Sequence, residues 1–312
     1  MPEKILMTSQ AFFRSECLAE LETRYEVHRL WEASDQEALI SEVAPQIRVV
    51  VTEGWAPAEF QAKFPNLELI ASHGVGYDGV DLGAAQARKI AVTNTPGVLD
   101  DAVADLTIGL LIAVTRGMVV GDQYVRDGEW LKANFPLMSH LRERQAGILG
   151  LGRIGLAIAQ RLQAFGIEIN YHNRRERSDV DYKYYSSLSM MAQDVDFLIL
   201  SCVGGEETKK IVNREIMEKI GPNGVLINIS RGSVVDEGDL VACLEEGKLG
   251  GAGLDVFTSE PHVPEALFKI PQVVLQPHIG SATLQTRIAM GQLVVDNVDA
   301  YYAKKPLLTP VA

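Results

Sequence analysis

The sequence predicts an α/β protein built from two doubly wound parallel sheets. Short apolar runs alternate with helical stretches up to about residue 95, and the same alternation restarts at residue 147. Strands that alternate with helices are typical of a parallel sheet covered by helices. The length of 312 residues fits about two domains. Composition agrees, because 47% hydrophobic and 22% charged residues is an ordinary balance for a chain that buries substantial cores.

The elements follow in chain order. The first five strand candidates are KILMT, YEVHRL, IRVVVT, LELIAS and KIAVTN. Residues 95–130 are predicted to form one long helix, with Asp100 and Asp101 suited to its beginning and Gly128 near its end. Six more strand candidates are GILGLG, IEINYH, VDFLILSCV, GVLINIS, GAGLDVF and VVLQPH. Residues 283–304 have helical periodicity, and we expect this last helix to return to the first domain.

Charge and cysteine content exclude several function classes. The net charge is −12 and no long basic run occurs, which argues against nucleic acid as a partner. The three cysteines lie far apart without a C-x-x-C pair, so neither a disulfide framework nor a metal site is expected. No apolar stretch reaches 18 residues, so no membrane association is expected. We expect a cytoplasmic protein.

A glycine-rich turn at 147–166 predicts a dinucleotide site. Gly150, Gly152 and Gly155 stand between an apolar run and a long helical pattern, where they would give a tight turn, close approach of a pyrophosphate and close helix packing. Amides at the helix start would then face the pyrophosphate. A second G-x-G-x-x-G occurs at 74–79, but only about eight residues after it could be helical. After Gly152, by contrast, a helical apolar face continues for over three turns through Ile154, Leu156, Ile158, Leu162 and Phe165. The cofactor is therefore assigned to the motif at 150–155.

The residues after the next strand indicate which dinucleotide binds. NAD sites generally place an acidic residue about 20 positions beyond the glycines, where it accepts from the ribose 2′-hydroxyl. Here Asn173, Arg174 and Arg175 occupy that region, and guanidinium groups would pair with an adenosine 2′-phosphate. The sequence thus predicts NADP, with NADPH preferred over NADH. Glu176 keeps some use of NAD open, and a solvated basic turn is the structural alternative.

Three polar residues come shortly after strand candidates of the second sheet. Arg231 follows GVLINIS, Glu260 lies soon after GAGLDVF, and His278 ends VVLQPH. Ligands of open α/β sheets bind beyond the carboxyl ends of strands, so the three side chains could converge. An arginine would hold the oxygens of a 2-keto acid, an imidazolium would supply a proton, and a carboxylate would stabilise that imidazolium. Taken singly, each could instead be a turn cap or a packed or surface residue.

Several motifs together resemble the D-isomer-specific 2-hydroxyacid dehydrogenase family. They are HGVGYDGVD, TPGVLDDAVADLTIGLLIA, LGLGRIG, ISRGSVVDEGDL, GAGLDVFTSEP and QPHIGSAT, in order from about residue 68. Within that family the chain most resembles glyoxylate/hydroxypyruvate reductases. The resemblance implies a Rossmann-type cofactor domain at 98–284, including the long helix, and a flavodoxin-like substrate domain at 1–97 and 285–312. It also implies a homodimer formed largely through that helix.

The resemblance assigns roles residue by residue. It makes His278 the acid/base, Glu260 its carboxylate partner and Arg231 the substrate clamp, and it places Asp255 near the nicotinamide, although a strand-end cap is the alternative there. Val75 and Gly76 match the loop whose amides hold the substrate carboxylate. The cofactor positions that match are Gly150, Gly152, Arg153, Ile154, Gly155, Asn173, Arg174, Arg175, Cys202, Val203, Ile229, Asp255, His278 and Gly280.

The expected activity is NADPH-dependent reduction of a small 2-keto acid, glyoxylate or hydroxypyruvate, to the D-2-hydroxy acid. A reductase of a bulkier keto acid, hydroxyphenylpyruvate or 2-ketogluconate, is the enzymatic alternative. A second class is a dinucleotide-sensing corepressor that binds peptides and turns over slowly, which fast turnover would exclude.

Overall fold

The computed structural model describes residues 2–10 and 13–311 and divides the chain into two compact units. Unit 1 comprises residues 1–99 and 281–312, and unit 2 comprises residues 100–280. The C-terminal helix α11 (Leu284–Tyr302) belongs to unit 1, which is therefore discontinuous in sequence. Residues 1 and 312, the outer ends of the expected domains, lie outside the described residues.

Unit 1 holds a five-stranded sheet in which all neighbours run parallel, in the order β2-β1-β3-β5-β7. This is the flavodoxin-like doubly wound order. A short β4-β6 pair stands beside it. The elements before α11 are β1 (Lys4–Met7), α1 (Ser15–Arg24), β2 (Glu26–Arg29), α2 (Gln36–Val43), β3 (Val49–Thr52), β4 (Trp55–Ala56), α3 (Ala58–Ala62), β5 (Leu69–Ser72), β6 (Gly79–Val80), α4 (Leu82–Ala87) and β7 (Ala91–Thr93), with short 3₁₀ turns η1 (Leu30–Glu32) and η2 (Ala44–Gln46).

Alternation along the strands of unit 1 explains why helices cover both faces. Odd-numbered positions such as Val51 and Leu69 pack with apolar side chains of α1 and α11, and even-numbered positions such as Val50 and Ile70 pack with those of α2, α3 and α4. Successive strand residues point to opposite faces, so a strand buried on both faces reads as a continuous apolar run. That is the pattern that the sequence showed.

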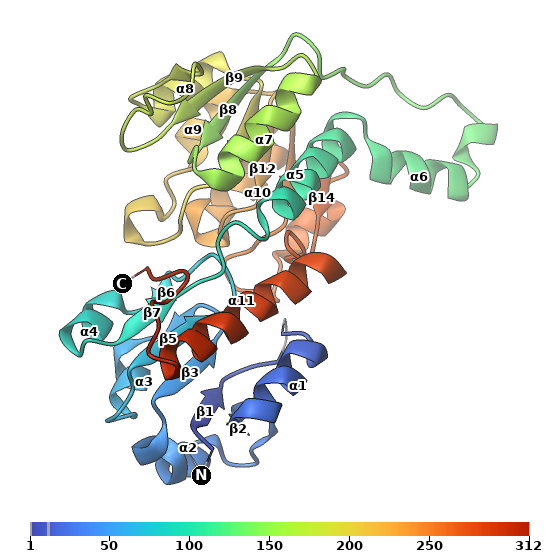
Figure 1. The fold of residues 1–312 in the computed structure, drawn as a ribbon. Helices are drawn as coiled ribbons and strands as arrows, with labels where there is room; N and C mark the ends of the chain where they lie inside the picture. The colour runs from blue at the N-terminus through green and yellow to red at the C-terminus, as the bar shows by residue number, and fades with distance from the viewer. Residues whose placement is uncertain (1, 11–12, 312) are drawn as a thin grey trace. The chain divides into compact units, whose positions relative to one another are not determined.

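Unit 2 holds a seven-stranded parallel sheet in the order β10-β9-β8-β11-β12-β13-β14, the Rossmann order with one strand added. Its elements are α5 (Asp100–Thr115), α6 (Met118–Arg126), η3 (Glu129–Leu131), β8 (Gln145–Leu149), α7 (Arg153–Ala164), β9 (Glu168–His172), β10 (Lys183–Tyr184), α8 (Leu188–Asp194), β11 (Phe197–Leu200), η4 (Glu206–Thr208), α9 (Arg214–Ile220), β12 (Val225–Asn228), η5 (Gly232–Val234), α10 (Glu237–Glu245), β13 (Gly251–Leu254), η6 (Glu265–Lys269) and β14 (Val273–Leu275). Figure 1 shows the strands of each unit with helices against them. The two-residue strands β4, β6 and β10 are too short to give a periodic pattern, and the sequence did not predict them.

Two local predictions for unit 2 need correction. Residues 95–130 do not form one helix, because α5 begins at Asp100 and ends at Thr115, and α6 is bent away from it by 59°. Gly97 and Gly117 have φ of +84° and +59°, left-handed conformations that interrupt a helix. The predicted apolar face of α7 also ends early, because Phe165 caps the helix and is 39% exposed. In the described part of the chain, no single helix is long and apolar enough to cross a membrane, and only the bent pair α5 and α6 reaches those limits together.

The C-terminal tail of unit 1 is fastened by one buried amide side chain. Asn297 in α11 is 1% exposed and accepts hydrogen bonds at Oδ1 from the N–H groups of Leu308 and Thr309, at 3.0 and 3.3 Å. Its Nδ2 donates to the Leu293 carbonyl at 2.8 Å and to the Thr309 hydroxyl at 3.0 Å. The tail then runs beside β7, where the Val311 N–H donates to the Val92 carbonyl. The Asn297 side chain thus accepts two hydrogen bonds at Oδ1 and donates two from Nδ2, which is its full hydrogen-bonding capacity.

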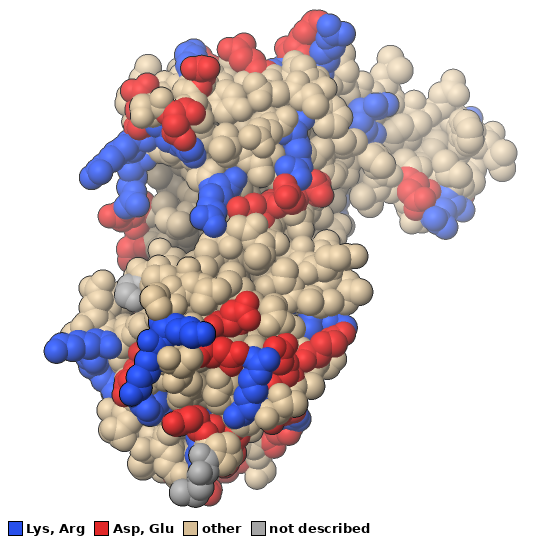
Figure 2. All heavy atoms as spheres, viewed as in Figure 1, with Lys and Arg blue, Asp and Glu red and all other residues tan. Residues whose placement is uncertain are grey.

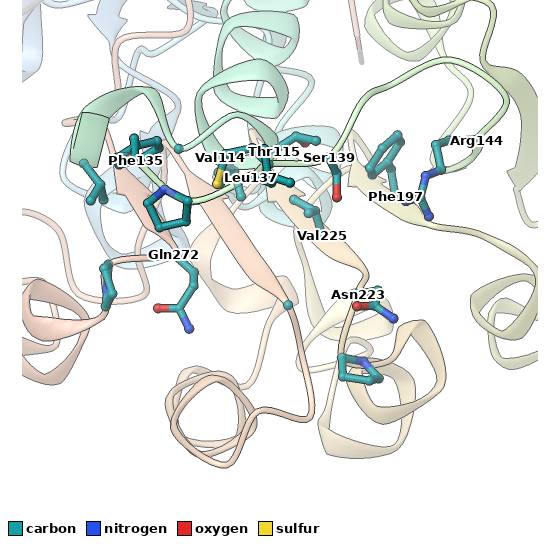
Figure 3. Close-up of a pocket in the computed structure, with 17 residues that line it drawn as sticks. Val114, Thr115, Phe135, Leu137, Ser139, Arg144, Phe197, Asn223, Val225 and Gln272 are labelled. Carbon is teal, nitrogen blue, oxygen red and sulfur yellow. The ribbon is translucent and has the colours of Figure 1, made fainter. Parts of the chain in front are cut away.

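Segment 118–138 of unit 2, which begins with α6, carries several exposed apolar side chains. No side chain of α6 is buried, and Leu131 and Leu137 are 93% and 101% exposed. Figure 1 shows α6 standing away from the sheet. A pocket of about 430 Å³ lies where this segment passes the amino ends of the strands, and Figure 3 shows Phe135, Leu137 and Val225 lining it. On the face drawn in Figure 2, basic and acidic side chains are interspersed.

Candidate active site

The residues predicted for unit 2 lie along one edge of its sheet, where every parallel strand ends. The glycine turn follows β8, the 173–175 turn follows β9, Cys202 follows β11, and Arg231 follows β12. Asp255 and Glu260 follow β13, and His278 follows β14. Because β8 and β11 are neighbours from which the strand order runs outward in both directions, this edge holds the topological switch point at which doubly wound sheets bind ligands.

The three glycines of the turn have the three geometries that the motif requires. Gly150 has φ +96°, and a Cβ there would lie 2.5 Å from the Cys202 backbone. A Cβ at Gly155 would lie 2.5 Å from the Gly150 carbonyl oxygen, so helix α7 packs too closely on the turn for any side chain. At Gly152 a Cβ would meet nothing within 4 Å. The open position therefore stands at the beginning of α7, where a pyrophosphate could approach the backbone.

The beginning of α7 offers amide donors to such a group. The Leu156 N–H donates to the Gly152 carbonyl at 3.0 Å, so the amides of Arg153, Ile154 and Gly155 precede the first intrahelical bond. Such amides together with the helix dipole attract phosphate groups. Arg153 lies 3.5 Å from Asp100, and its side chain is 63% exposed. The residues present thus fit the diphosphate of a dinucleotide.

In the turn after β9, Asn173 braces the backbone, whereas Arg174 and Arg175 are exposed. Asn173 Oδ1 accepts from the Leu151 N–H at 2.7 Å, which ties this turn to the glycine turn. Arg177, which the sequence did not single out, donates to the Leu151 carbonyl at 2.8 Å. Arg174 and Arg175 are exposed, and Arg174 Nη1 lies 3.0 Å from Glu207 Oε2. Both arginines can therefore reach solvent beside the glycine turn.

Four further predicted cofactor positions, Cys202, Val203, Ile229 and Gly280, have no charged side chain. Cys202 stands against Gly150, and burial raises the pKa of its thiol to about 11, so it is no nucleophile at neutral pH. Val203 is 68% exposed, an apolar surface beside the turn, whereas Ile229 is buried. Gly280 is closely packed, because a Cβ there would lie 3.1 Å from Asp255 Oδ2.

His278 and Glu260 form a pair at the ends of neighbouring strands. His278 Nδ1 lies 2.7 Å from Glu260 Oε2, and Glu260 Oε1 accepts from the Phe257 N–H at 2.9 Å. Burial alone would raise the pKa of Glu260, but the bonds from His278 and Phe257 and the nearby Arg231 charge hold it below its usual value. Because an ionised carboxylate only accepts, Nδ1 carries the hydrogen of the bond between the two side chains.

Arg231 is held on the neighbouring loop by close backbone packing. Its Nη1 donates to the Ser230 carbonyl at 2.8 Å. The next residue, Gly232, has no room for a side chain, because a Cβ would lie 1.9 Å from the Phe257 carbonyl carbon. The loops after β12 and β13 therefore touch, which brings the Arg231 charge close enough to lower the pKa of Glu260. The structure brings the three predicted side chains to one part of the sheet edge.

Asp255 holds the backbone on which His278 stands. Its Oδ1 and Oδ2 accept from the N–H groups of Ile279 and Gly280 at 2.7 and 2.8 Å, and its carbonyl accepts from the His278 N–H at 2.9 Å. His278 itself has φ +54°. Burial raises the pKa of Asp255, although the two amide bonds oppose that effect. These contacts match the strand-end cap that the sequence left as the alternative for Asp255, and nothing in the sequence marked the bonds to 279 and 280.

In unit 1, Val75 and Gly76 lie in the loop that follows β5. Asn94 Nδ2 donates to the Val75 carbonyl at 2.9 Å, and the Gly74 N–H donates to Thr95 Oγ1 at 3.0 Å, so the loop is braced. The second glycine motif is thus followed by a short strand and the six-residue α4 rather than by a long helix.

The comparisons with known proteins agree with this geometry. Residues 108–280 match the family model of the D-isomer specific 2-hydroxyacid dehydrogenase, NAD binding domain. The chain is 48% identical over 294 residues to a glyoxylate/hydroxypyruvate reductase A of Arabidopsis thaliana, with 94% of each chain covered. It is 47% identical to a hydroxyphenylpyruvate reductase of Plectranthus scutellarioides, with the same coverage. The crystal structure of an NADPH-dependent glyoxylate/hydroxypyruvate reductase from Sinorhizobium meliloti, in complex with NADP and malonate, superposes with a TM-score of 0.94 at 44% identity, covering 100% of this chain and 97% of that one.

The matched family domain contains the glycine turn, the arginines after β9 and the His278–Glu260 pair, and similarity to full-length reductases extends over almost the whole chain. The protein is therefore an enzyme that belongs to the D-isomer specific 2-hydroxyacid dehydrogenase family.

Proposed function

We propose that the enzyme reduces a small 2-keto acid, glyoxylate or hydroxypyruvate, to the D-2-hydroxy acid with NADPH. The observation that carries the proposal is the 2.7 Å contact between His278 and Glu260 on the same sheet edge as the glycine turn. An imidazole whose Nδ1 is held by a carboxylate can exchange a proton through Nε2. The names of the Arabidopsis and Sinorhizobium relatives support the choice of substrate.

The bound nicotinamide would supply the hydride, and the chain's own residues would handle the substrate and the proton. His278 gives a proton from Nε2 to the carbonyl oxygen, while Glu260 stabilises the imidazolium and keeps the ring oriented. Arg231 engages the carboxylate and carbonyl oxygens through its planar guanidinium. In unit 1, the N–H groups of Val75 and Gly76 are the candidates for binding a carboxylate.

The open face of Gly152 and the first amides of α7 suit the diphosphate, and Val203 offers an exposed apolar surface to the adenosine, which are features that NADH and NADPH share. Two observations support NADPH as the preferred cofactor. Arg174 and Arg175 are exposed cations in the turn after β9, and their charges suit a 2′-phosphate. The Sinorhizobium relative is described as NADPH-dependent.

Replacing His278 tests the chemical step. We expect His278→Ala to lower kcat about 10²- to 10⁴-fold, because positioned acid catalysis is typically worth that much. Arg231→Ala should weaken substrate binding as well as turnover. His140→Ala, which changes an exposed histidine far along the chain, is the matched control. Near-normal turnover of His278→Ala across the pH range would show that the proton donor lies elsewhere.

Replacing Arg174 tests the cofactor. Loss of a charged hydrogen bond costs about 1.5–3 kcal/mol, and because the side chain is 83% exposed we expect the lower end, about a tenfold loss of kcat/KM with NADPH. With NADH, Arg174→Ala should stay within a few-fold of the wild type. Equal losses with both cofactors would mean that Arg174 supports the fold, and a wild-type preference for NADH would contradict the proposal.

A bulkier substrate is the second candidate, and the similarity to a hydroxyphenylpyruvate reductase favours it. An NADPH-oxidation panel over glyoxylate, hydroxypyruvate, pyruvate, 2-ketogluconate and phenylpyruvate, ranked by kcat/KM, separates the two. Turnover that is slow with every keto acid would point instead to the dinucleotide-sensing role.

We propose that the protein is a homodimer in which the apolar segment 118–138 is covered by the second copy. Its support is the exposure of Leu131 and Leu137, since side chains of this size rarely stay uncovered together. A cytoplasmic location is proposed because Cys17, Cys202 and Cys243 are all free thiols.

A further inference from the structure

The 3.0 Å ion pair between Arg174 and Glu207 joins two loops that lie on either side of the glycine turn. Arg174 follows β9 and Glu207 lies in η4 after β11, while the turn follows β8, which stands between them in the sheet. Neighbouring strands are about 4.8 Å apart, so the two outer strands are separated by roughly 10 Å. The pair therefore reaches across the end of β8 from one loop to the other.

Both ends of this bridge stand on loops with fixed backbones. Asn173, next to Arg174, is held by the Leu151 N–H, and its carbonyl accepts from the Tyr184 hydroxyl at 3.2 Å. Thr208, next to Glu207, donates through Oγ1 to the Val203 carbonyl at 2.8 Å. The braced loop backbones thus hold the Arg174 and Glu207 charges close to each other, although both side chains are largely exposed to solvent.

We propose that Glu207 is a cofactor-selectivity residue that occupies the Arg174 guanidinium until a 2′-phosphate displaces it. This inference rests on the NADPH preference proposed above. In the free enzyme the carboxylate stands where an anionic group of the cofactor must pair, so NADPH binding exchanges one anion for another at Arg174. NADH has the same diphosphate but no 2′-phosphate, so it leaves the pair between Arg174 and Glu207 intact. Glu207 therefore limits the affinity for NADPH and has little influence on NADH.

The size of the effect follows from exposure. The Arg174–Glu207 ion pair is exposed to solvent, so breaking it costs little free energy. The Glu207 carboxylate also repels the 2′-phosphate dianion. Removing the Glu207 charge should therefore lower Kd for NADPH about two- to tenfold. The gain should shrink as ionic strength rises, because the Debye length falls from about 30 Å at 0.01 M salt to about 10 Å at 0.1 M.

The experiment measures Kd of NADPH and NADH by fluorescence titration, without keto acid, for the wild type, Glu207→Gln and Glu206→Gln. Glu206 is the matched control, because it lies in the same turn, has the same charge and pairs with Lys209 at 3.3 Å instead of with Arg174. We expect Glu207→Gln to bind NADPH more tightly at low salt with NADH unchanged, and Glu206→Gln to match the wild type. Equal gains for the two variants would reduce the effect to net charge and overturn the proposal.

A double-mutant cycle separates this inference from the cofactor assignment. In an Arg174→Ala background, Glu207→Gln should lose most of its effect on NADPH, because the carboxylate acts through the guanidinium. An undiminished effect would overturn the inference while leaving the NADPH preference in place. A wild type that binds NADH more tightly than NADPH, unaltered by Arg174→Ala, would instead overturn the cofactor assignment.

Discussion

His73 is a deeply buried imidazole, and it should make unit 1 lose stability in mild acid. The residue is 3% exposed, both ring nitrogens lack partners within the described chain, and its ring meets Phe13 edge-on at 5.3 Å. Burial, together with the positive charge of Arg287 in α11, lowers the pKa of His73 from 6.5 to about 4. The folded protein therefore keeps this side chain neutral where an unfolded chain would protonate it.

The sign and size of the pH effect on the free energy of unfolding follow from the difference between the folded and unfolded pKa of His73. The pKa of His73 is depressed in the folded protein, so its contribution to the free energy of unfolding is fully present above pH 6.5. That contribution is lost as the pH falls from 6.5 toward 4, the range in which the unfolded chain binds the proton more readily than the folded chain. A difference of 2.5 pKa units corresponds to about 3 kcal/mol in total, of which about 2 kcal/mol is lost by pH 5. His73→Leu removes the titration, so the stability difference between variant and wild type should change by about 2 kcal/mol between pH 8 and pH 5.

Urea unfolding at a series of pH values measures this difference. The chain has three tryptophans, and a Trp130→Phe background leaves Trp31 and Trp55, both in unit 1, as the fluorescent reporters. Carboxylates elsewhere titrate equally in both proteins and cancel. His140→Leu, at an exposed histidine, should show no such pH dependence. A difference between His73→Leu and the wild type that stays constant from pH 8 to pH 5 would refute the assignment.

Three further outcomes are expected. Gly232→Ala should lower stability by about 1–3 kcal/mol and reduce kcat/KM, because its Cβ meets the Phe257 backbone; Gly109→Ala, where a Cβ meets nothing within 4 Å, should be neutral or stabilising in the same urea titrations. Asn297→Ala should cost about 2–4 kcal/mol and expose the C-terminal tail to limited proteolysis, and a tail that stays resistant would show that β7 holds it alone. In sedimentation, the 34.2 kDa chain should run as a dimer that Leu131→Asp with Leu137→Asp dissociates, and a stable wild-type monomer at micromolar concentration would contradict the proposed interface.

The strands, and the polar residues that follow them, could be predicted because each sequence pattern lies within a few consecutive residues. Runs such as IRVVVT are continuous and β-branched, as strands buried on both faces must be, and polar residues directly after them mark the binding edge. The glycine turn was predictable for the same reason, since Gly155 packs on the carbonyl of Gly150, five residues before it, and Gly150 itself has a positive φ.

The features that could not be predicted from the sequence depend on the folded backbone and on contacts between residues far apart in the chain. A glycine inside a helical pattern is often tolerated, so the break at Gly117 required knowledge of its conformation in the folded chain. Arg174 and Glu207 are 33 positions apart and meet only because β9 and β11 flank β8. Similarly, Arg177 and Asp255 act on backbone groups of other loops, and no spacing announces such bonds.

The three hydrogen bonds from residues 278–280 to Asp255 link the position of His278, the proposed proton donor, to the docking of an edge strand. His278 stands on the turn after β14, the outermost strand on its side of the sheet, and its left-handed backbone is kept in place from β13. Edge elements open more readily than central ones, with free energies below that of global unfolding. When β14 frays, the three hydrogen bonds from residues 278–280 to Asp255 are lost together. The His278 imidazole is then no longer held in its orientation, while the other six strands of the sheet can stay paired. Inactivation by denaturant should therefore run ahead of the collapse of the sheet, and enzyme activity becomes a sensor for the integrity of one border of the fold.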